Sequence, residues 1–288
     1  MLIENIIRKI YLKIYFFIKK KFLFKDGYGL SYYIYKNTRP EDTFRRGVRT
    51  DDTTVFYVID KLLNSKTLIN TESINCLDVG GYIGVITLLM SKKLSEQKKK
   101  WKVHTFEPFY DSYLKLKENI NLDPNKNNIV LNNVAVSNKI GYSLLKTYND
   151  KPGENHLDPV ILKEKPTISD DYVEVITLEN YIQENEINQV NICKIDTEGS
   201  DNYVLQGLSK YISKKKIDYL IFEYQDDSYL EIYNFLNMNS YKVFYLVRNE
   251  DMLVSSLEKY PKICKKVLNF IAVSPDKVDH FMTKFNLE

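Results

Sequence analysis

The chain has 288 residues, 44% of them hydrophobic, and a formal net charge of +3. This length suits one large α/β domain or two small ones, and the hydrophobic content is ample for a buried core. The small net charge does not indicate a nucleic-acid partner. The three cysteines are far apart and lack zinc spacing, which argues against a metal or disulfide scaffold and predicts a reducing, cytoplasmic compartment.

The first 26 residues are basic and carry apolar side chains at helical spacing. They contain seven basic and two acidic side chains, a net of +5, so the rest of the chain has a net charge of −2. The apolar stripe from Ile3 to Ile18 predicts an amphipathic helix, but Lys13 interrupts it and it is too short to span a membrane. Two alternatives stay open. Residues 1–26 contact the anionic inner face of a membrane, or the helix docks on the domain or on a partner chain.

A short apolar run followed by three glycines and a helix-like pattern predicts a strand, a tight turn and a helix. The glycines are Gly80, Gly81 and Gly84. Glycine lets backbone N–H groups and a helix N-terminus approach a ligand that a Cβ would keep away, and simple packing of the turn is the alternative explanation. Asp78 stands near the carboxyl end of this strand, where open α/β sheets bind ligands.

The second predicted strand ends in an acid. Residues 102–106 lead into Glu107-Pro108, which places Glu107 29 positions after Asp78. An acid at this place can accept hydrogen bonds from both hydroxyls of a ribose, and the proline can open the next helix because its position needs no N–H donor. The glycine spacing fits the dinucleotide pattern Gly-x-Gly-x-x-Gly poorly. The pattern therefore favours a nucleoside-containing ligand over a dinucleotide.

Residues 138–172 interrupt the alternation of helices and strands. A third strand is predicted over residues 129–136 before this segment, and a hairpin over residues 142–148 within it. Long loops in compact domains are commonly functional, so we expect a substrate-side insertion. It contains His156, whose imidazole could accept a proton from a hydroxyl near neutral pH, although no other feature of the sequence connects it to the site.

A charged block ends the next predicted strand. Lys194, Asp196 and Glu198 alternate along it, so strand geometry predicts that they face the same side. Charges inside a central parallel strand are costly unless paired, which predicts an ion pair between Lys194 and Asp196. A functional role for Asp196 and Glu198 beside a substrate is compatible with that pair. Carboxylates also suit magnesium, but two acids do not define a metal site, and no residue is assigned as a metal ligand.

The rest of the chain is predicted to complete the sheet. The expected elements are a helix over residues 178–184, a helix over 202–211, a strand over 219–224, a helix over 228–238, a strand over 242–247, a polar loop over 248–261 and a last strand over 268–273.

Four blocks of the sequence resemble the FkbM-type methyltransferases, a branch of the S-adenosylmethionine-dependent Rossmann-like enzymes. They are Leu77-Asp78-Val79-Gly80-Gly81-Tyr82-Ile83-Gly84, Phe106-Glu107-Pro108, Asn133-Val134-Ala135-Val136-Ser137, and Lys194-Ile195-Asp196-Thr197-Glu198-Gly199 followed by Val204-Leu205-Gln206-Gly207. The resemblance covers residues 50–275. It implies a class I methyltransferase fold over residues 50–288, with a seven-stranded, mostly parallel sheet, one antiparallel strand and helices on both faces. Residues 1–49 are then the basic helix and an irregular linker.

The resemblance also implies site residues. The implied contacts to S-adenosylmethionine are Asp78, Gly80, Gly81, Tyr82, Gly84, Glu107, Pro108, Asn133 and Ala135, and the implied acceptor-side residues are Asp196 and Glu198, to which we add His156. At Tyr82 the family usually has Asn.

FkbM-like proteins commonly methylate hydroxyls, often on sugars. The first hypothesis is therefore an O-methyltransferase acting on a sugar hydroxyl of a glycan or glycoconjugate. The second is a non-catalytic ligand-binding or assembly protein on the same fold, which the unusual Tyr82 favours. A nicotinamide-dependent oxidoreductase is disfavoured by the glycine spacing and by the absence of a suitably placed Tyr-x-x-x-Lys pair.

Overall fold

The structure is a computed structural model that describes residues 21–36, 53–64, 71–146, 156–166, 172–223, 229–247, 252–255 and 267–287. The predicted amphipathic helix over residues 3–18 lies outside these ranges. None of the helices in them is long and apolar enough to cross a membrane.

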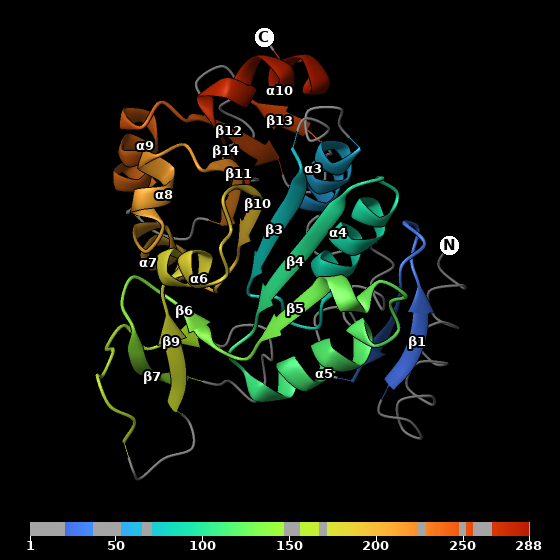
Figure 1. The fold of residues 1–288 in the computed structure, drawn as a ribbon, viewed down its shortest axis with the longest axis vertical. Helices are drawn as coiled ribbons and strands as arrows, with labels where there is room; N and C mark the ends of the chain where they lie inside the picture. The colour runs from blue at the N-terminus through green and yellow to red at the C-terminus, as the bar shows by residue number, and fades with distance from the viewer. Residues whose placement is uncertain are drawn as a thin grey trace, which may run out of the picture.

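A mostly parallel sheet forms the centre of the molecule (Figure 1). Its strands lie in the order β13 (Met252–Val254), β12 (Lys242–Val247), β14 (Val267–Val273), β11 (Ile217–Glu223), β10 (Val190–Ile195), β3 (Ser73–Val79), β4 (Lys100–Phe106) and β5 (Ile129–Asn132). The five strands from β11 to β5 are parallel, and β14 is antiparallel to β11. The predicted mostly parallel sheet with helices on both faces is confirmed, but not its count of seven strands with one antiparallel strand. The short β13, inside the predicted polar loop, adds an eighth strand and a second antiparallel one.

Helices cover both faces of this sheet. One face carries α3 (Thr53–Leu63), α4 (Val85–Ser95), α5 (Tyr110–Ile120) and α10 (Val278–Phe285). The other carries α6 (Leu178–Glu184), α7 (Asp201–Gln206), α8 (Ser209–Ser213) and α9 (Tyr229–Met238). Two 3-10 turns, η2 (Lys126–Asn128) and η4 (Pro275–Lys277), precede β5 and α10. Because strand side chains alternate, Cys76 and Leu77 of β3 belong to opposite cores. The helix predicted over 202–211 is two helices, α7 and α8.

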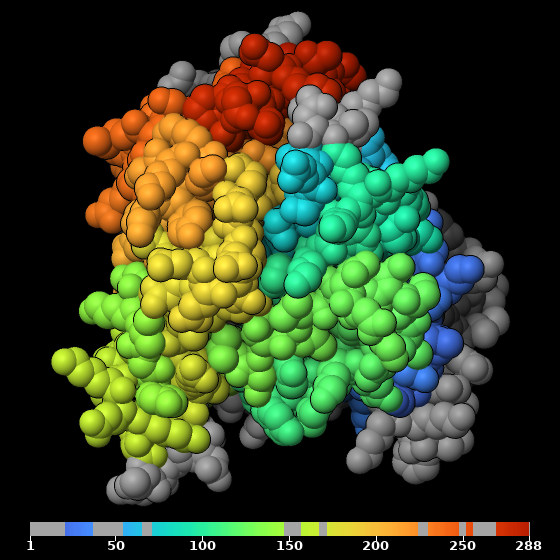
Figure 2. All heavy atoms as spheres, in the orientation of Figure 1, coloured from blue at the N-terminus to red at the C-terminus, as the bar shows by residue number. Residues whose placement is uncertain are grey.

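Four short strands between Ala135 and Ile176 form a second, smaller sheet. It contains β6 (Ala135–Val136), β9 (Tyr172–Ile176), β7 (Gly141–Lys146) and β8 (His156–Leu157), in that order. The predicted continuous strand over 129–136 is therefore wrong, because the chain leaves β5 at Asn132 and enters the second sheet at Ala135. In Figure 2 this insertion lies at the lower left, below α6 and beside the green surface of α5 and its neighbours.

The segment before residue 36 also differs from the prediction. The end of the basic segment, β1 (Lys21–Lys25), pairs in an antiparallel hairpin with β2 (Ser31–Tyr35), which lies where an irregular linker was expected. Tyr32 and Ile34 of β2 belong to the core formed with α3, α4 and α5. The boundary of the methyltransferase domain at residue 50 stays a prediction.

One buried amide joins this hairpin to the glycine turn. Asn119 of α5 is fully buried, and its Oδ1 accepts a hydrogen bond from the N–H of Tyr33 at 2.7 Å. Its Nδ2 donates to the carbonyl of Ile83 at 2.8 Å and to that of Tyr33 at 3.4 Å. The side chain thus pairs with Tyr33 as a neighbouring strand would and also holds the turn that precedes α4.

We expect Asn119→Asp to lower the free energy of unfolding by about 2 kcal/mol or more, because a carboxylate oxygen would replace the donor that faces the Ile83 carbonyl in a buried place. Thermal and urea unfolding at pH 8 measure this. Asn121→Asp, an exposed change at the end of the same helix, is the control and should change stability by about 0.5 kcal/mol or less. Equal effects of the two substitutions would contradict the assigned role of Asn119.

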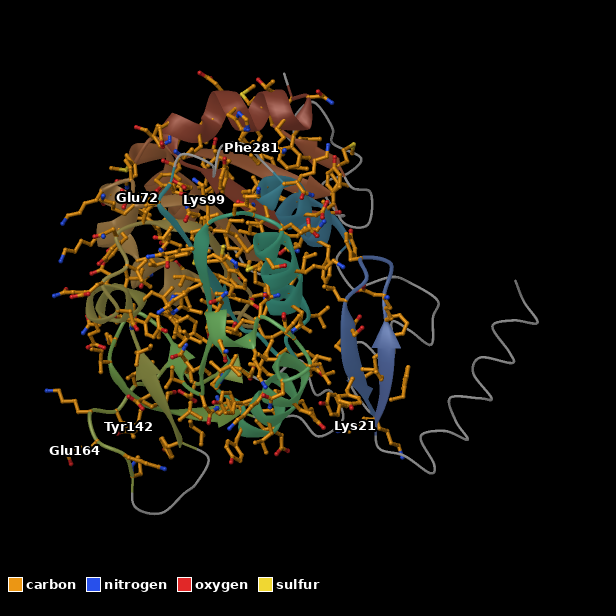
Figure 3. The ribbon with its side chains drawn as sticks, turned by 45° about the vertical axis from the view of Figure 1, so that its right-hand side comes forward. Lys21, Glu72, Lys99, Tyr142, Glu164 and Phe281 are labelled. Atoms are coloured by element: carbon orange, nitrogen blue, oxygen red, sulfur yellow. The ribbon has the colours of Figure 1, made fainter. Side chains whose placement is uncertain are left out.

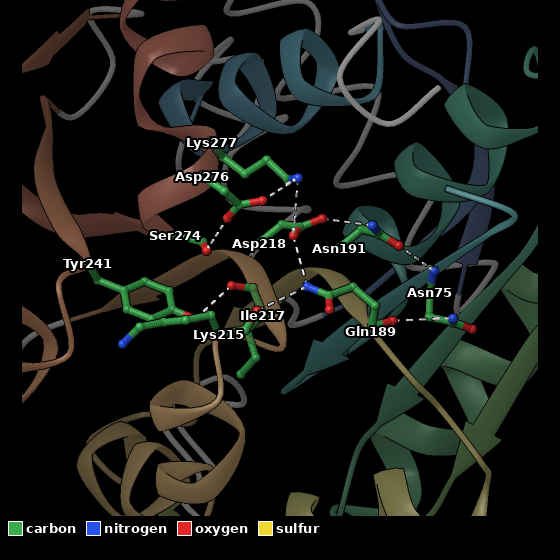
Figure 4. A network of polar contacts seen from close by, with 10 residues as sticks. All are labelled: Asn75, Gln189, Asn191, Lys215, Ile217, Asp218, Tyr241, Ser274, Asp276 and Lys277. Atoms are coloured by element: carbon green, nitrogen blue, oxygen red, sulfur yellow. Dashed lines mark hydrogen bonds and ion pairs between the residues drawn. The ribbon is translucent and has the colours of Figure 1, made fainter. Parts of the chain in front are cut away.

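A polar network closes the amino-terminal edge of the sheet (Figure 4). The carboxylate of Asp218, 2% exposed, accepts hydrogen bonds from Asn191 at 2.8 Å and Gln189 at 2.9 Å, and Lys277 lies 3.9 Å away. A hollow of 440 Å³ adjoins it. Of the charged residues that line this hollow, Lys277 pairs with Asp218 and Asp276, and Lys215 donates to the carbonyl of Asn239, which supports a structural role. Figure 3 shows Glu72 and Lys99 of this edge at the opposite end of the molecule from the insertion.

Candidate active site at the carboxyl edge of the sheet

The chain reverses its direction of strand addition between β3 and β10. From β3 the next strands, β4 and β5, are added on one side, while β10 and β11 are added on the other. Open α/β sheets bind ligands at such a switch point, outside the carboxyl ends of the strands. The N–H of Asp196 donates to the carbonyl of Val79 at 3.0 Å, so the glycine turn and the loop after β10 lie side by side.

The glycines of the turn are required by close packing within the protein. Gly80 has φ +80°, and a Cβ there would overlap the carbonyl oxygen of Asp196. A Cβ on Gly81 would overlap the side chain of Thr105. Both glycine N–H groups donate to the carbonyl of Phe106, at 3.0 and 2.9 Å. The expectation that these N–H groups reach toward a ligand is therefore corrected, since they are used inside the protein. Two parts of this region can still contact a ligand: the start of α4 and the acid that follows β4.

That acid, Glu107, is 7% exposed and aims its carboxylate at the turn. Its Oε2 accepts a hydrogen bond from the N–H of Tyr82 at 2.8 Å, and its Oε1 accepts one from the N–H of Phe109 at 2.9 Å. Burial raises the pKa of Glu107 to about 7, against the effect of these donors and of Lys194. Because a carboxylate offers about four lone-pair sites, two remain to accept hydrogen bonds from a ligand.

A buried lysine connects the ends of β3 and β10. The Nζ of Lys194 lies 3.6 Å from Asp78 Oδ1 and 3.4 Å from Asp196 Oδ2, and it donates to the carbonyl of Gly80 at 3.1 Å. Asp78 is fully buried and also accepts a hydrogen bond from Thr87 at 2.6 Å, whereas the Asp196 side chain is 36% exposed. Burial acts to lower the pKa of Lys194, but Asp196 and Asp78 outweigh it and raise the pKa. The predicted Lys194–Asp196 ion pair is present.

The loop after β10 departs from strand geometry. β10 ends at Ile195, and Glu198 has φ +52°, so strand alternation does not extend to Glu198, and the prediction that all three charged residues share one face is wrong for it. Sequence reasoning also missed Asp201, which is 5% exposed and holds this loop. The only sequence signal was its place at the start of a helix, and that position is common for exposed acids.

The remaining predicted site residues lie around this edge. Asn133 Nδ2 donates to the carbonyls of Glu107 at 2.9 Å and Pro108 at 3.1 Å and so holds the end of β4. Ala135 is buried in β6, where it pairs with Val175. The backbone of His156 pairs with Lys146 in the second sheet, but its side chain is not among those described. Within the described ranges, no group of three metal-binding side chains is present.

Comparison with known proteins identifies the family. The Methyltransferase FkbM domain matches residues 78–243 of this chain. The chain belongs to the FkbM methyltransferase family. A search of curated proteins found no match.

Solved structures of methyltransferases are among those similar to parts of this chain. Methyltransferase FkbM from Methylobacillus flagellatus KT is 15% identical, with a TM-score of 0.46 over 74% of this chain and 47% of that one, so this chain spans about half its length. The N-terminal domain of human METTL16 in complex with SAH is 12% identical, with a TM-score of 0.41 over 77% and 68%. A SAM-dependent methyltransferase from Agrobacterium tumefaciens is 8% identical, with a TM-score of 0.44 over 90% and 71%.

S-adenosylmethionine is the methyl donor of FkbM methyltransferases, and the described residues fit it. Glu107 is buried at the end of β4 with lone pairs left for the ribose hydroxyls. The first turn of α4 has N–H groups without helical partners. Asp78, Gly80, Gly81, Gly84, Pro108, Asn133 and Ala135 stay predictions as direct contacts, and the structure gives most of them a packing or hydrogen-bonding role beside Glu107.

Tyr82 of the FkbM domain occupies the left-handed region, with φ +49°. Asn tolerates this conformation far better than most residues, which gives a physical reason for the Asn usually found there. We expect Tyr82→Val to be less stable than Tyr82→Asn by about 1 kcal/mol, because β-branched residues are disfavoured at positive φ. Thermal unfolding of both variants measures this difference. Since both lose the tyrosine ring, equal stabilities would contradict the conformational explanation.

Proposed function

We propose that the protein is an S-adenosylmethionine-dependent O-methyltransferase that acts on a sugar hydroxyl of a glycan or glycoconjugate. The observation that carries the proposal is the Lys194–Asp196 pair, which stands at the switch point directly beside the glycine turn. Asp196 is the partly exposed member of this group of charges, and it is the carboxylate that an acceptor can reach.

In the proposed mechanism the protein has two main roles, which are to orient the acceptor and to take up its proton. S-adenosylmethionine supplies an activated methyl group, so the protein must mainly align the acceptor and take up its proton. Lys194, with its Nζ 3.4 Å from Asp196 Oδ2, holds this carboxylate at the edge of the sheet. Asp196 accepts a hydrogen bond, and then the proton, from the hydroxyl. Glu198 orients a neighbouring hydroxyl. His156 in β8 is a proposed second proton acceptor on the insertion side.

A sugar is favoured as the acceptor class by the family resemblance and by the chemistry of the loop. Two neighbouring carboxylates, such as those of Asp196 and Glu198, can accept hydrogen bonds from adjacent hydroxyls of a sugar ring. The small net charge gives no reason to include a nucleic acid among the proposed partners. The basic residues 1–26 are compatible with work on membrane-linked glycans, and we propose a cytoplasmic enzyme with peripheral contact to the inner face of a membrane.

Transfer of a labelled methyl group from S-adenosylmethionine to a panel of nucleotide sugars, methyl glycosides and lipid-linked saccharides tests this function. We expect transfer to a hydroxyl oxygen, located by mass spectrometry and NMR, and a decrease in kcat of about 100-fold or more for Asp196→Asn. Asp279→Asn, an exposed acid in the first turn of α10, is the control. Methylation of nitrogen, or no transfer by a protein that binds S-adenosylhomocysteine, would refute the O-methyltransferase assignment. The second result would favour a non-catalytic binding protein.

A further inference from the structure

Asp201 begins α7, and its side chain points back to the loop after β10. Its Oδ1 accepts hydrogen bonds from the N–H of Thr197 at 2.8 Å and from the hydroxyl of the same residue. Its Oδ2 accepts one from the N–H of Glu223 at 3.0 Å. The residue is 5% exposed. A single buried carboxylate therefore contacts two separate segments of the chain.

These two segments are the ends of neighbouring strands. The parallel pairing of β10 with β11 ends at Ile195 and Phe222. Glu223, the next residue of β11, donates its N–H to Asp201, and Thr197 lies two residues past the end of β10. Asp201 thus continues the connection between the two strands after their backbone pairing stops, at the edge where Asp196 and Glu198 stand.

The loop between them needs such support. Glu198 and Gly199 both have positive φ, +52° and +97°, and a left-handed conformation at a residue with a side chain costs about 1 kcal/mol or more. Such conformations persist only where the surroundings determine them. Both hydrogen-bond donors of Thr197, which precedes Glu198, donate to the Asp201 carboxylate. The position of Glu198 is therefore set by a residue three positions further along the chain.

We propose that Asp201 is the positioning residue of the acceptor loop, residues 196–200: its carboxylate ties this loop to the end of β11 and so determines where Asp196 and Glu198 meet the acceptor. Burial raises the pKa of Asp201 to about 7, and the nearby charge of Asp196 adds to this, which agrees with a carboxylate kept in a costly place for its hydrogen bonds. The part of this inference that concerns the acceptor depends on the proposed function.

Asp201→Asn tests directly whether the Asp201 carboxylate connects the acceptor loop to the end of β11. An amide can accept from only one of the two segments, because its NH2 group would face the other N–H donor. We expect amide exchange to become about tenfold faster or more in the peptides that contain Thr197 or Glu223, while Kd for S-adenosylhomocysteine changes by about threefold or less. With a sugar acceptor, kcat should decrease by about 10- to 100-fold at an unchanged KM for S-adenosylmethionine. Asp279→Asn is the control for loss of a helix-initiating acid.

A second pair of variants keeps the test valid if Asp201→Asn does not fold. Thr197→Ser keeps the hydroxyl and should behave as the wild type, whereas Thr197→Val loses one hydrogen bond to Asp201 and should show smaller changes of the same kind. Unchanged exchange in the two peptides, or an unchanged kcat with a loosened loop, would overturn the inference. If the wild type methylates no sugar, the proposed function fails, and the exchange measurement alone decides whether Asp201 holds the loop.

Discussion

S-adenosylhomocysteine should bind about tenfold more tightly at pH 8 than at pH 6, and Glu107→Gln should remove this difference. The pKa of Glu107 is raised to about 7 by burial, so in the free protein the ionised fraction rises about tenfold between these pH values. The ionised carboxylate is the form that accepts two further hydrogen bonds from ribose hydroxyls. Binding therefore takes place with the deprotonated group, and affinity increases as the pH rises through the pKa.

Calorimetric titration at several pH values in buffers of different ionisation enthalpy measures this effect and the proton released on binding. Glu107→Gln should bind about 10- to 100-fold more weakly than the wild type at pH 8 and show a flat profile from pH 6 to pH 8. Asp111→Asn removes an exposed acid four residues away in the first turn of α5 and should keep the wild-type profile. A tenfold pH dependence that persists in Glu107→Gln would assign the proton to another group and remove Glu107 from the cofactor contact.

The second large effect concerns stability. Lys194→Met should lower the free energy of unfolding by about 3–5 kcal/mol, because it leaves the carboxylate of Asp78 buried without its cation. Asp78 is fully buried, and apart from Lys194 its polar contact is the hydroxyl of Thr87. Burial already raises the pKa of Asp78, and the charge of Lys194 opposes this. Methionine has a similar length, so the loss of charge dominates the change.

A double-mutant cycle with Asp78→Asn separates the ion pair from packing. The double variant Lys194→Met/Asp78→Asn has neither charge at these two positions. We expect it to regain about half of the free energy of unfolding that Lys194→Met loses, as measured by urea unfolding. Lys93→Met is the matched control. Its ion pair with Asp60 is partly exposed, and its loss should cost about 1 kcal/mol or less. If Lys194→Met and Lys93→Met lower the free energy of unfolding by equally small amounts, the buried Lys194–Asp78 pair does not hold the ends of β3 and β10 together.

The sequence predicted the parts of the site that depend on neighbouring residues. The strand, glycine turn and helix around Gly80 and the acid at the end of β4 follow from local patterns, and the topological switch point then brings them together. The Lys194–Asp196 pair was predicted because β10 keeps strand geometry up to Ile195. Local pattern and global fold agree at these positions.

The parts that were not predicted depend on distant residues. The strands of the N-terminal hairpin have alternating side chains, but β2 is held by Asn119, 86 residues after Tyr33. The direction of Glu198 depends on a positive φ that Asp201 supports. Similarly, the chain passes from β5 to β6 because Ala135 pairs with Val175, far along the sequence. A pattern of apolar residues does not contain such pairings, since each needs the partner's place in space.

Titration calorimetry of the purified protein with S-adenosylhomocysteine at pH 8, in parallel with Glu107→Ala and with NAD as a second ligand, tests the cofactor site most directly. We expect saturable binding with one site, a loss of affinity of about 100-fold or more in Glu107→Ala, and no binding of NAD. Wild-type affinity in Glu107→Ala, or binding of NAD without binding of S-adenosylhomocysteine, would contradict a methyl-donor site at the switch point between β3 and β10.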